Sequence, residues 1–274
     1  MAYARTAFST RTVDLYTRAL THLQTLAGDV ALSSLPAQRV DLYKGRRLAS
    51  ISPVSVNMEL RALKAAFSTA ARWKLIEASP FLNLQAVSVP EVPPSYLTKA
   101  DFQKLTTVIS EGWLHDLVVF AVSTGVRQVE MLNLRWQDVD LERRLITIQS
   151  SQTFRTKAGK WRVLPMNDVV AALLHRRAER AAAGFVFTRR GRPIGKSYLQ
   201  HRFKRFVREA GLDDRLHWHS LRHTHATWLV QAGATLYEVQ RLLGHSSPRV
   251  TEIYSHLLPE HLHRTVNRIK LPLN

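Results

Sequence analysis

The sequence predicts a mainly α-helical protein with a small β-sheet, and its 274 residues suit two domains. Three observations support this. Apolar residues recur at helical spacing through most of the chain, one segment alternates like a β-hairpin, and a proline-rich stretch interrupts both patterns. That stretch, VSVPEVPPSY (87–96), holds three prolines that cannot continue a helix and favour an extended connector. We therefore predict a helical domain over residues 1–88, a linker over 89–95 and a second domain over 96–274.

In the first domain, apolar residues at helical spacing predict a helix around residues 13–23. A second helix is better marked, because Ser52 can cap it, Pro53 suits its first turn, and an apolar stripe runs over residues 56–67. No internal repeat interrupts this region, which we predict to be all-helical.

The second domain is predicted to be mainly helical with a small sheet. LHDLVVFAVSTG (114–125) is typical of a buried helix that ends at a glycine. The apolar run LITI (145–148), the basic turn KAGK (157–160) and WRVLP (161–165) together indicate a β-hairpin. Helical patterns resume near Asp168, break at GFVFTRRGRPIG (184–195) and continue to the end.

The charge is strongly positive, with 39 Lys and Arg against 21 Asp and Glu, or +18 in all. Both predicted domains share the excess, which indicates a polyanionic partner, most simply nucleic acid. The chain has no cysteine, which excludes disulfides, thiolate zinc sites and cysteine nucleophiles. Because no secretory signal or membrane-length apolar segment is visible, we expect a cytoplasmic protein with no membrane partner.

The segment HWHSLRHTH (217–225) gathers four histidines around one arginine. His219 and His223 are four residues apart, as two metal ligands on a helix would be. A metal site is disfavoured, because zinc sites usually also recruit a thiolate or a carboxylate. The chain has no cysteine, the nearest acidic residues only flank the cluster, at Asp214 and Glu238, and Arg222 would repel the ion. His223 and His225 are interpreted as packing or capping residues. His219 and Arg222, three residues apart on one helical face, form a donor-rich surface suited to phosphate.

Glycines then turn the chain back on itself. The helix that carries Arg222 is predicted to stop at Gly233, and TLYE (235–238) is a capping-box pattern for a helix that stops at Gly244. His245 follows at once, and a further short helix from Ser247 carries Tyr254. These turns can bring His219, Arg222, His245 and Tyr254 together.

The combination of H-x-L-R (219–222), L-G-H (243–245) and Tyr254 nine residues later resembles the tyrosine recombinase, or phage integrase, family. TGVRQVEMLNLRWQDVD (124–140) is similar to that family's first arginine box, with Arg127 as the box arginine. TKAGKWRVLP (156–165) resembles its lysine-bearing β-hairpin; we map the lysine to Lys157, with Lys160 as the alternative. The likeness covers residues 96–258, and the helical domain resembles the family's core-DNA-binding domain more loosely.

The resemblance implies a site-specific recombinase that cuts and rejoins DNA through a 3′-phosphotyrosyl link, with 96–274 as the catalytic domain. Tyr254 would be the nucleophile, and the two arginines would bind the phosphate oxygens bidentately. His245 would donate a further hydrogen bond, and His219 would accept the tyrosine proton or orient the phosphate. Lys157 would protonate the leaving 5′-oxygen. No cofactor, metal or ATP is implied.

Glu130, in the first arginine box, is expected to brace an active-site arginine. His225 departs from the family pattern, where an apolar or aromatic residue is usual. The chain also has the size of the two-domain members, which lack an arm-binding domain.

The expected partners are double-stranded DNA and further copies of this chain in a tetramer on DNA. The segment PEHLHRTVNRIKLPLN (259–274) has one apolar face, so it either closes its own domain or docks on the neighbouring protomer. Docking in trans is the reading we favour.

Three alternatives remain open at this point. The glycine-bearing turn at Gly244 has the arrangement of a helix-turn-helix, which would make the protein a non-catalytic regulator. A type IB topoisomerase shares the tyrosine and arginine chemistry. A recombinase-derived DNA-binding protein that has lost catalysis is the third.

Overall fold

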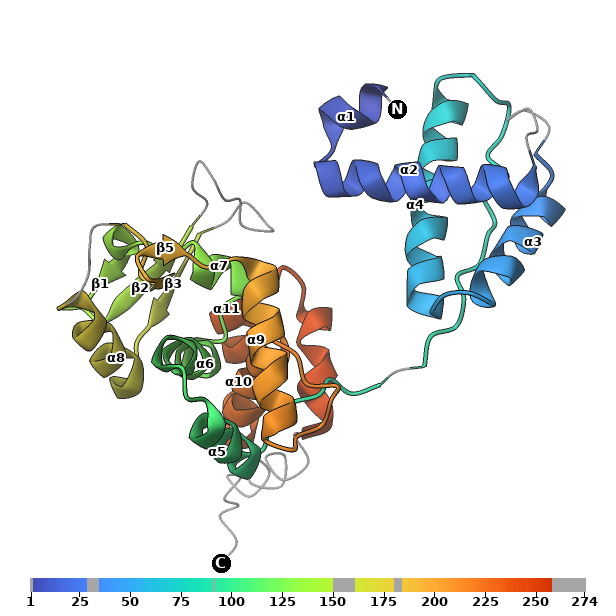
Figure 1. Cartoon of the computed structure of the whole chain (residues 1–274). Coiled ribbons are helices and arrows are strands. Elements are labelled where there is room, and N and C mark those ends of the chain that lie inside the picture. Colours follow the sequence, from blue (N-terminus) through green and yellow to red (C-terminus); the bar gives the residue numbers. More distant parts are fainter. Residues whose placement is uncertain (1, 29–34, 91, 150–160, 180–183, 258–274) are drawn as a thin grey trace, which may run out of the picture. The chain divides into compact units, whose positions relative to one another are not determined.

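The structure is a computed structural model that describes residues 2–28, 35–90, 92–149, 161–179 and 184–257 (Figure 1). The chain divides into two compact units, Met1–Val92 and Pro93–Asn274. This division falls inside the proline-rich stretch that the sequence predicts as the linker.

The N-terminal unit is helical throughout its described elements, which are α1 (Ala2–Ala7), α2 (Thr10–Ala27), α3 (Ala37–Leu48) and α4 (Pro53–Arg72). The predicted start of α4 is confirmed, since Ser52 Oγ accepts a hydrogen bond from the Ser55 amide and Pro53 is the first helical residue. Helices α2, α3 and α4 pack against one another around a buried core that includes Tyr43, Phe67 and Phe81.

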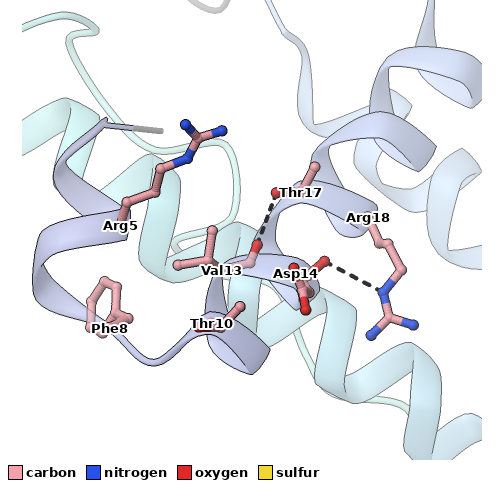
Figure 2. A pocket seen from close by; sticks show the side chains of 7 residues that line it. All are labelled: Arg5, Phe8, Thr10, Val13, Asp14, Thr17 and Arg18. Carbon is pink, nitrogen blue, oxygen red and sulfur yellow. Dashed lines mark hydrogen bonds between the residues drawn. The ribbon is translucent and has the colours of Figure 1, made fainter.

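A surface cavity lies where α1 meets the start of α2. Figure 2 shows its lining residues, Arg5, Phe8, Thr10, Val13, Asp14, Thr17 and Arg18. The Arg18 side chain donates to the Asp14 carbonyl one turn earlier, so two of the polar groups here are engaged within α2. The ring of Phe8 also contacts that of Tyr16 edge-on.

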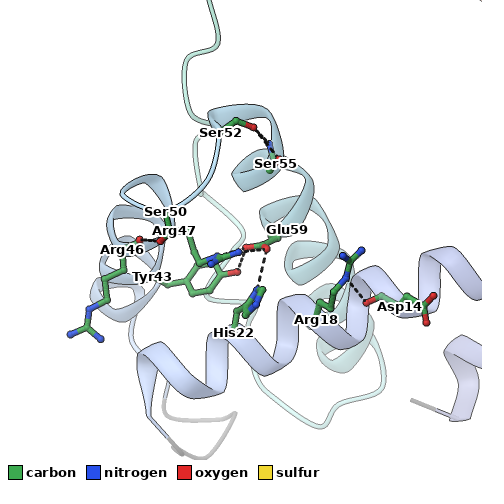
Figure 3. Close-up of polar contacts among 10 residues, drawn as sticks. All are labelled: Asp14, Arg18, His22, Tyr43, Arg46, Arg47, Ser50, Ser52, Ser55 and Glu59. Atoms are coloured by element: carbon green, nitrogen blue, oxygen red, sulfur yellow. Dashed lines mark hydrogen bonds and ion pairs between the residues drawn. The ribbon is translucent and has the colours of Figure 1, made fainter. Parts of the chain in front are cut away.

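A buried carboxylate ties the three long helices of this unit together (Figure 3). Glu59 of α4 accepts two hydrogen bonds from Arg47 and one from the Tyr43 hydroxyl, both on α3. His22 of α2 is 3.1 Å from the same carboxylate. Burial alone would raise the pKa of Glu59, but the Arg47 and Tyr43 hydrogen bonds lower it below its ordinary value. An ionised glutamate therefore fixes how α2, α3 and α4 meet.

The C-terminal unit combines helices with two small sheets. Its helices are α5 (Lys99–Val108), α6 (Gly112–Thr124), α7 (Gln128–Leu132), α8 (Asp168–Ala178), α9 (Lys196–Glu209), α10 (Ser220–Gln231) and α11 (Leu236–Leu243). Three 3₁₀ segments are η2 (Trp136–Asp138), η3 (Pro248–Val250) and η4 (Glu252–Leu257). The strands are β1 (Val139–Asp140), β2 (Leu145–Ile148), β3 (Arg162–Pro165), β4 (Thr188–Arg189) and β5 (Arg192–Pro193).

The larger sheet is antiparallel, in the order β1-β2-β3. Leu145 pairs with Pro165 and Ile148 with Arg162, so β2 and β3 form the hairpin that the sequence predicts. The segment 184–195, which the sequence shows only as a break between helices, contains the second sheet, β4-β5. With two residues per strand and a proline in β5, it has no alternation for a sequence pattern to show.

Helix α6 is the centre of the C-terminal unit. Its apolar residues are buried almost all round, and it packs against α8 on one side and α10 on the other (Figure 1). Gly125 ends α6 in the left-handed conformation, at φ 62°, as predicted. The predicted fold class, mainly α with a small sheet, is confirmed. No helix within the described ranges is long and apolar enough to cross a lipid bilayer.

Candidate active site

Arg222 is buried in the first turn of α10, and it binds the ends of two other helices. Its Nη1 donates to the carbonyl of Gly125, just after α6, at 2.6 Å. Its Nη2 donates to the carbonyl of Leu243, the last residue of α11, at 2.7 Å. Helix C-termini leave carbonyls unpaired and carry partial negative charge, so both are favourable partners for a guanidinium. Arg222 is thereby fixed in position by three helices.

Arg127 precedes α7 and lies beside Arg222. Its Nη2 donates to the carbonyl of Gly244 at 3.2 Å, one residue after the carbonyl that Arg222 binds. Burial lowers the pKa of Arg222, and the neighbouring Arg127 charge lowers it further. Two guanidinium groups that are 95 positions apart in the chain therefore meet at one short turn, 243–244. Like charges this close repel, and an anion between them would relieve the repulsion.

Glu130 holds Arg127 from the other side, as predicted. Its carboxylate accepts hydrogen bonds from Arg127 Nη1 at 2.9 Å and from the Arg127 amide at 3.0 Å. Arg162 of β3 adds a bidentate pair, at 3.1 and 2.6 Å. Burial would raise the pKa of Glu130, but the Arg162 and Arg127 contacts outweigh it and lower the pKa to about 2. Glu130 is thus a fixed negative charge that braces two arginines.

The turn at Gly244 brings His245 into the same region. Gly244 has φ 65°, which favours glycine, and a Cβ there would lie 2.8 Å from Arg162 Cδ, so a larger residue would strain the turn and displace the Arg162 side chain. His245 Nδ1 is hydrogen-bonded to Thr251 Oγ1 at 2.8 Å. Burial, followed by the charges of Arg222 and Arg127, lowers the pKa of His245 to about 3. The imidazole is neutral at physiological pH and keeps one N–H to donate.

Tyr254, on η4, is 1% exposed and packs in a small apolar cluster with Ala226, Val230, Val239 and Leu243. Its hydroxyl is hydrogen-bonded to His223 Nδ1 at 2.6 Å. Burial raises the pKa of Tyr254 to about 12, and the charge of Arg222 offsets only part of that rise. The phenol is therefore protonated, shielded from solvent and held by the residue next to Arg222.

The histidine cluster divides into different environments. The ring of His219 meets that of His223 edge-on, with centroids 4.9 Å apart, so His219 is in the same region as Tyr254. Burial first, then the neighbouring His219, His217 and Arg222, lowers the pKa of His223 to about 4. The interpretation of His223 as a packing residue is wrong, because it contacts the tyrosine hydroxyl.

His225, by contrast, packs as predicted. It is buried, and its Nδ1–H donates to the carbonyl of Val122 at 2.8 Å. Its ring fills the space above Gly125, where a Cβ would lie only 2.5 Å from His225 Cδ2. The departure from the family pattern thus leaves a well-packed residue with a backbone partner on α6.

Five of the six predicted catalytic residues lie in the described part of the chain and gather around the turn at 243–245. Lys157, its alternative Lys160 and the predicted tail helix 259–274 lie outside the described residues. Over the ranges that the structure describes, no three His, Asp or Glu side chains are arranged to hold a metal ion.

Residues 95–261 match the phage integrase family. The chain belongs to this family. A relative from Xanthomonas campestris, tyrosine recombinase XerC, is 31% identical over 269 residues, which is 93% of this chain and 81% of that protein. Tyrosine recombinase XerA from Thermococcus kodakarensis is 30% identical, over 96% of this chain and 90% of that protein. The predicted class, a tyrosine-type site-specific recombinase, is confirmed for this phage integrase family member.

Solved structures share the fold. The integrase of transposon Tn1549 in complex with transposon right end DNA has a TM-score of 0.82 at 23% identity, covering 98% of this chain and 97% of that chain. A lambda integrase dimer bound to a core site has a TM-score of 0.75 at 19% identity, covering 90% of this chain and 92% of that one. Both likenesses extend over nearly the whole chain, including the N-terminal unit.

The helix-turn-helix alternative does not fit this phage integrase family member. In a helix-turn-helix, an α-helix that enters the DNA major groove should follow the turn after α11. The chain instead forms the short 3₁₀ segments η3 and η4 there, and Tyr254 is buried. Sequence reasoning missed Arg162 and Thr251, which support Glu130 and His245. Arg162 lies in WRVLP, where the only signal in the sequence is a basic residue within a predicted strand; its pairing with Glu130 of the first arginine box is visible only in the structure.

Proposed function

We propose that this protein cuts and rejoins duplex DNA through a covalent 3′-phosphotyrosyl link on Tyr254. One observation carries the proposal. Arg222 and Arg127 donate to the consecutive carbonyls of Leu243 and Gly244, and the Tyr254 hydroxyl is hydrogen-bonded to the residue that follows Arg222. A pair of fixed guanidinium groups beside a phenol suits phosphoryl transfer to that phenol, and the basic charge of the chain suits a DNA substrate.

The arginines are proposed to bind the non-bridging oxygens of the scissile phosphate, where negative charge grows in the transition state. Carbonyl oxygens already hold both guanidinium groups, which supports the proposal, because little reorganisation is then needed when a phosphate replaces some of these contacts. His245, neutral and held by Thr251, would donate one further hydrogen bond to the same oxygens. The guanidinium groups supply the positive charge that a divalent ion provides in other phosphoryl-transfer enzymes.

The tyrosine must be uncovered before it can react. With 1% exposure and a pKa raised to about 12, Tyr254 is protected and unreactive in the described conformation. We propose that DNA binding shifts the 3₁₀ segments η3 and η4, so that the hydroxyl leaves His223 Nδ1 and faces the phosphate. His219 would then accept the phenolic proton or orient the phosphate.

The bonds and protons of the proposed reaction balance without an external cofactor. The Tyr254 oxygen forms a bond to phosphorus as the bond from phosphorus to the 5′-oxygen breaks. The leaving 5′-oxygen takes a proton from Lys157, or from Lys160 in the alternative assignment. The phosphotyrosyl link conserves the bond energy, so a second strand's 5′-hydroxyl can reverse the step and release the tyrosine.

Assembly belongs to the same proposal. We propose that the N-terminal unit binds the core DNA site, that four chains assemble on DNA, and that residues 259–274 dock on the neighbouring protomer. The solved relatives include recombinase–DNA complexes and a dimer on a core site, which supports a multimeric DNA complex. A cytoplasmic location accords with a DNA substrate.

A suicide-substrate assay tests the proposed function. Nicked duplexes drawn from the DNA that flanks the gene are incubated with wild-type protein, Tyr254→Phe and Arg222→Lys, and adducts are resolved on denaturing gels. We expect a covalent adduct with wild type, none with Tyr254→Phe, and a loss of roughly 10²-fold or more in rate with Arg222→Lys, because lysine cannot bind bidentately. An adduct that forms equally well with Tyr254→Phe would contradict the proposal. Relaxation of supercoiled plasmid without a partner site would favour a topoisomerase instead.

A further inference from the structure

The β4-β5 hairpin places three arginines around a surface cavity of about 570 Å³. Arg189 and Arg192 are directly opposite each other in the two-stranded sheet, so their side chains leave the same face. Arg190 lies in the connecting turn at φ 53°, followed by Gly191 at φ 73°. The lining is completed by Pro193, Ile194, Gly195 and Tyr198.

These arginines differ from most of the described arginines of the C-terminal unit, which form ion pairs with carboxylates. Arg176 and Arg177 share Asp116, and Arg202 pairs with Glu111. Among the residues that the structure describes, no carboxylate forms an ion pair with any of the three arginines of the hairpin. Like charges directly opposite on paired strands destabilise the pairing. An anion in this cavity would remove that repulsion.

The cavity is also preorganised. The Arg189 guanidinium lies over the ring of Tyr198, 5.1 Å from its centroid, and 5.8 Å from that of Trp113. The two rings stack on each other at 5.9 Å and 22°. These cation–π contacts hold Arg189 in place before any ligand arrives.

A hydrogen-bonded connection joins this cavity to the candidate active site. Gln128, which follows Arg127 directly, donates from Nε2 to the carbonyl of Lys196 at the start of α9, at 3.2 Å. Gln200, one turn further along α9, donates to Gln128 Oε1 at 3.0 Å. The backbone next to the cavity is therefore anchored to the segment that carries Arg127.

We propose that this arginine cavity is a second phosphate-binding site, which holds the backbone of duplex DNA at phosphates other than the scissile one. Three guanidinium groups that form no ion pair with a carboxylate of the described residues favour phosphate oxygens, and the Gln128 contact sets the spacing between these phosphates and Arg127. The inference rests on the proposed function only for the identity of the partner as DNA. The site contributes binding and register, and it takes no part in the chemical step.

The test measures binding of a short fluorescein-labelled duplex of mixed sequence by anisotropy, in a Tyr254→Phe background that prevents covalent trapping. The cavity variant combines Arg189→Gln, Arg190→Gln and Arg192→Gln. A control variant combines Arg143→Gln, Arg205→Gln and Arg208→Gln, which removes the same formal charge from exposed arginines that have acidic neighbours. Titrations between about 50 and 200 mM salt give the dependence of log Kd on log salt.

We expect the cavity variant to bind roughly tenfold more weakly, with a salt dependence shallower by about 0.9 for each phosphate that the variant no longer binds. The control should stay within about threefold of the parent. A cavity variant that keeps the parent's salt dependence, or a control that weakens as much as the cavity variant, overturns the proposal. If the triple change prevents folding, Arg192→Gln alone must still reduce the salt dependence by about 0.9.

The two proposals can fail separately. With Tyr254 intact and protein in excess, the cavity variant should still form the covalent adduct. If the wild-type chain forms no adduct, the proposed function is contradicted. The salt dependence of DNA binding alone decides whether the cavity binds phosphates.

Discussion

Replacing Glu130 by glutamine tests whether a buried carboxylate organises the arginines of the active site. The Glu130 side chain is 2% exposed and binds Arg127 and Arg162 with four hydrogen bonds. Glutamine has nearly the same shape, but it lacks the charge and accepts at only one atom. The variant therefore leaves two partly buried guanidinium groups without their counter-ion.

The pKa of Glu130 gives the expected magnitude. A carboxyl whose pKa falls from 4.5 to about 2 on folding stabilises the folded state by roughly 3 kcal/mol at neutral pH. Breaking a buried ion pair by removing one partner costs about 3–5 kcal/mol, which agrees. Because the folded pKa is depressed, this stability is complete above about pH 4.5 and is lost as the pH falls towards about 2.

Urea unfolding followed by tryptophan fluorescence measures the effect, since five of the six tryptophans are in the C-terminal unit. With an m-value of about 2–3 kcal/mol/M, the midpoint of Glu130→Gln should fall by about 1–1.5 M at pH 7. The difference in unfolding free energy from wild type should fall to roughly half by pH 3. Glu142→Gln, the same chemical change at an exposed position, should stay within about 0.5 kcal/mol of wild type.

Two results would refute this reasoning. One is a Glu130→Gln protein as stable as wild type at pH 7. The other is a stability difference that persists unchanged to about pH 3, because it would then arise from packing and not from the ionised carboxylate.

Three further changes have definite outcomes. Gly125→Ala should destabilise the C-terminal unit by several kcal/mol in urea unfolding, because the added Cβ would lie 2.5 Å from His225. The control Gly211→Ala, at φ 65° with open space around it, should cost only about 1 kcal/mol. Glu59→Gln should lower the melting temperature of the N-terminal unit, measured by circular dichroism, by removing about 3 kcal/mol; an unchanged transition would show that the buried carboxylate is not needed. The pKa of His223 is lowered to about 4 in the folded state, so the unfolded state binds a proton first and stability is lost as the pH falls from 6.5 to about 4. His223→Gln should therefore lose less unfolding free energy than wild type over that range. A loss equal to that of wild type would contradict the last expectation.

Local signals in the sequence predict much of this structure. The cap at Ser52, the capping box at Thr235 and Glu238, and the left-handed glycines at 125 and 244 are encoded within a few residues, and each lies where it was predicted. The two glycines mark the ends of α6 and α11, whose last carbonyls, those of Gly125 and Leu243, accept the hydrogen bonds of Arg222.

Contacts between distant segments could not be predicted in the same way. The pairing of Arg162 with Glu130 joins residues 32 positions apart through strand register. The contact of His223 with Tyr254 depends on the path of two 3₁₀ segments, which have no periodic apolar pattern. The strands β4 and β5 are too short for alternation, so the arginine cavity was visible only as a break between helices.

The most direct measurement is mass spectrometry of the trapped protein–DNA adduct after digestion with trypsin and nuclease. We predict a nucleotide remnant on the peptide that contains Tyr254, joined through its phenolic oxygen to a 3′-phosphate. A remnant on any other residue, or one joined through a 5′-phosphate, would show that Arg127 and Arg222 do not direct a DNA phosphate onto this tyrosine.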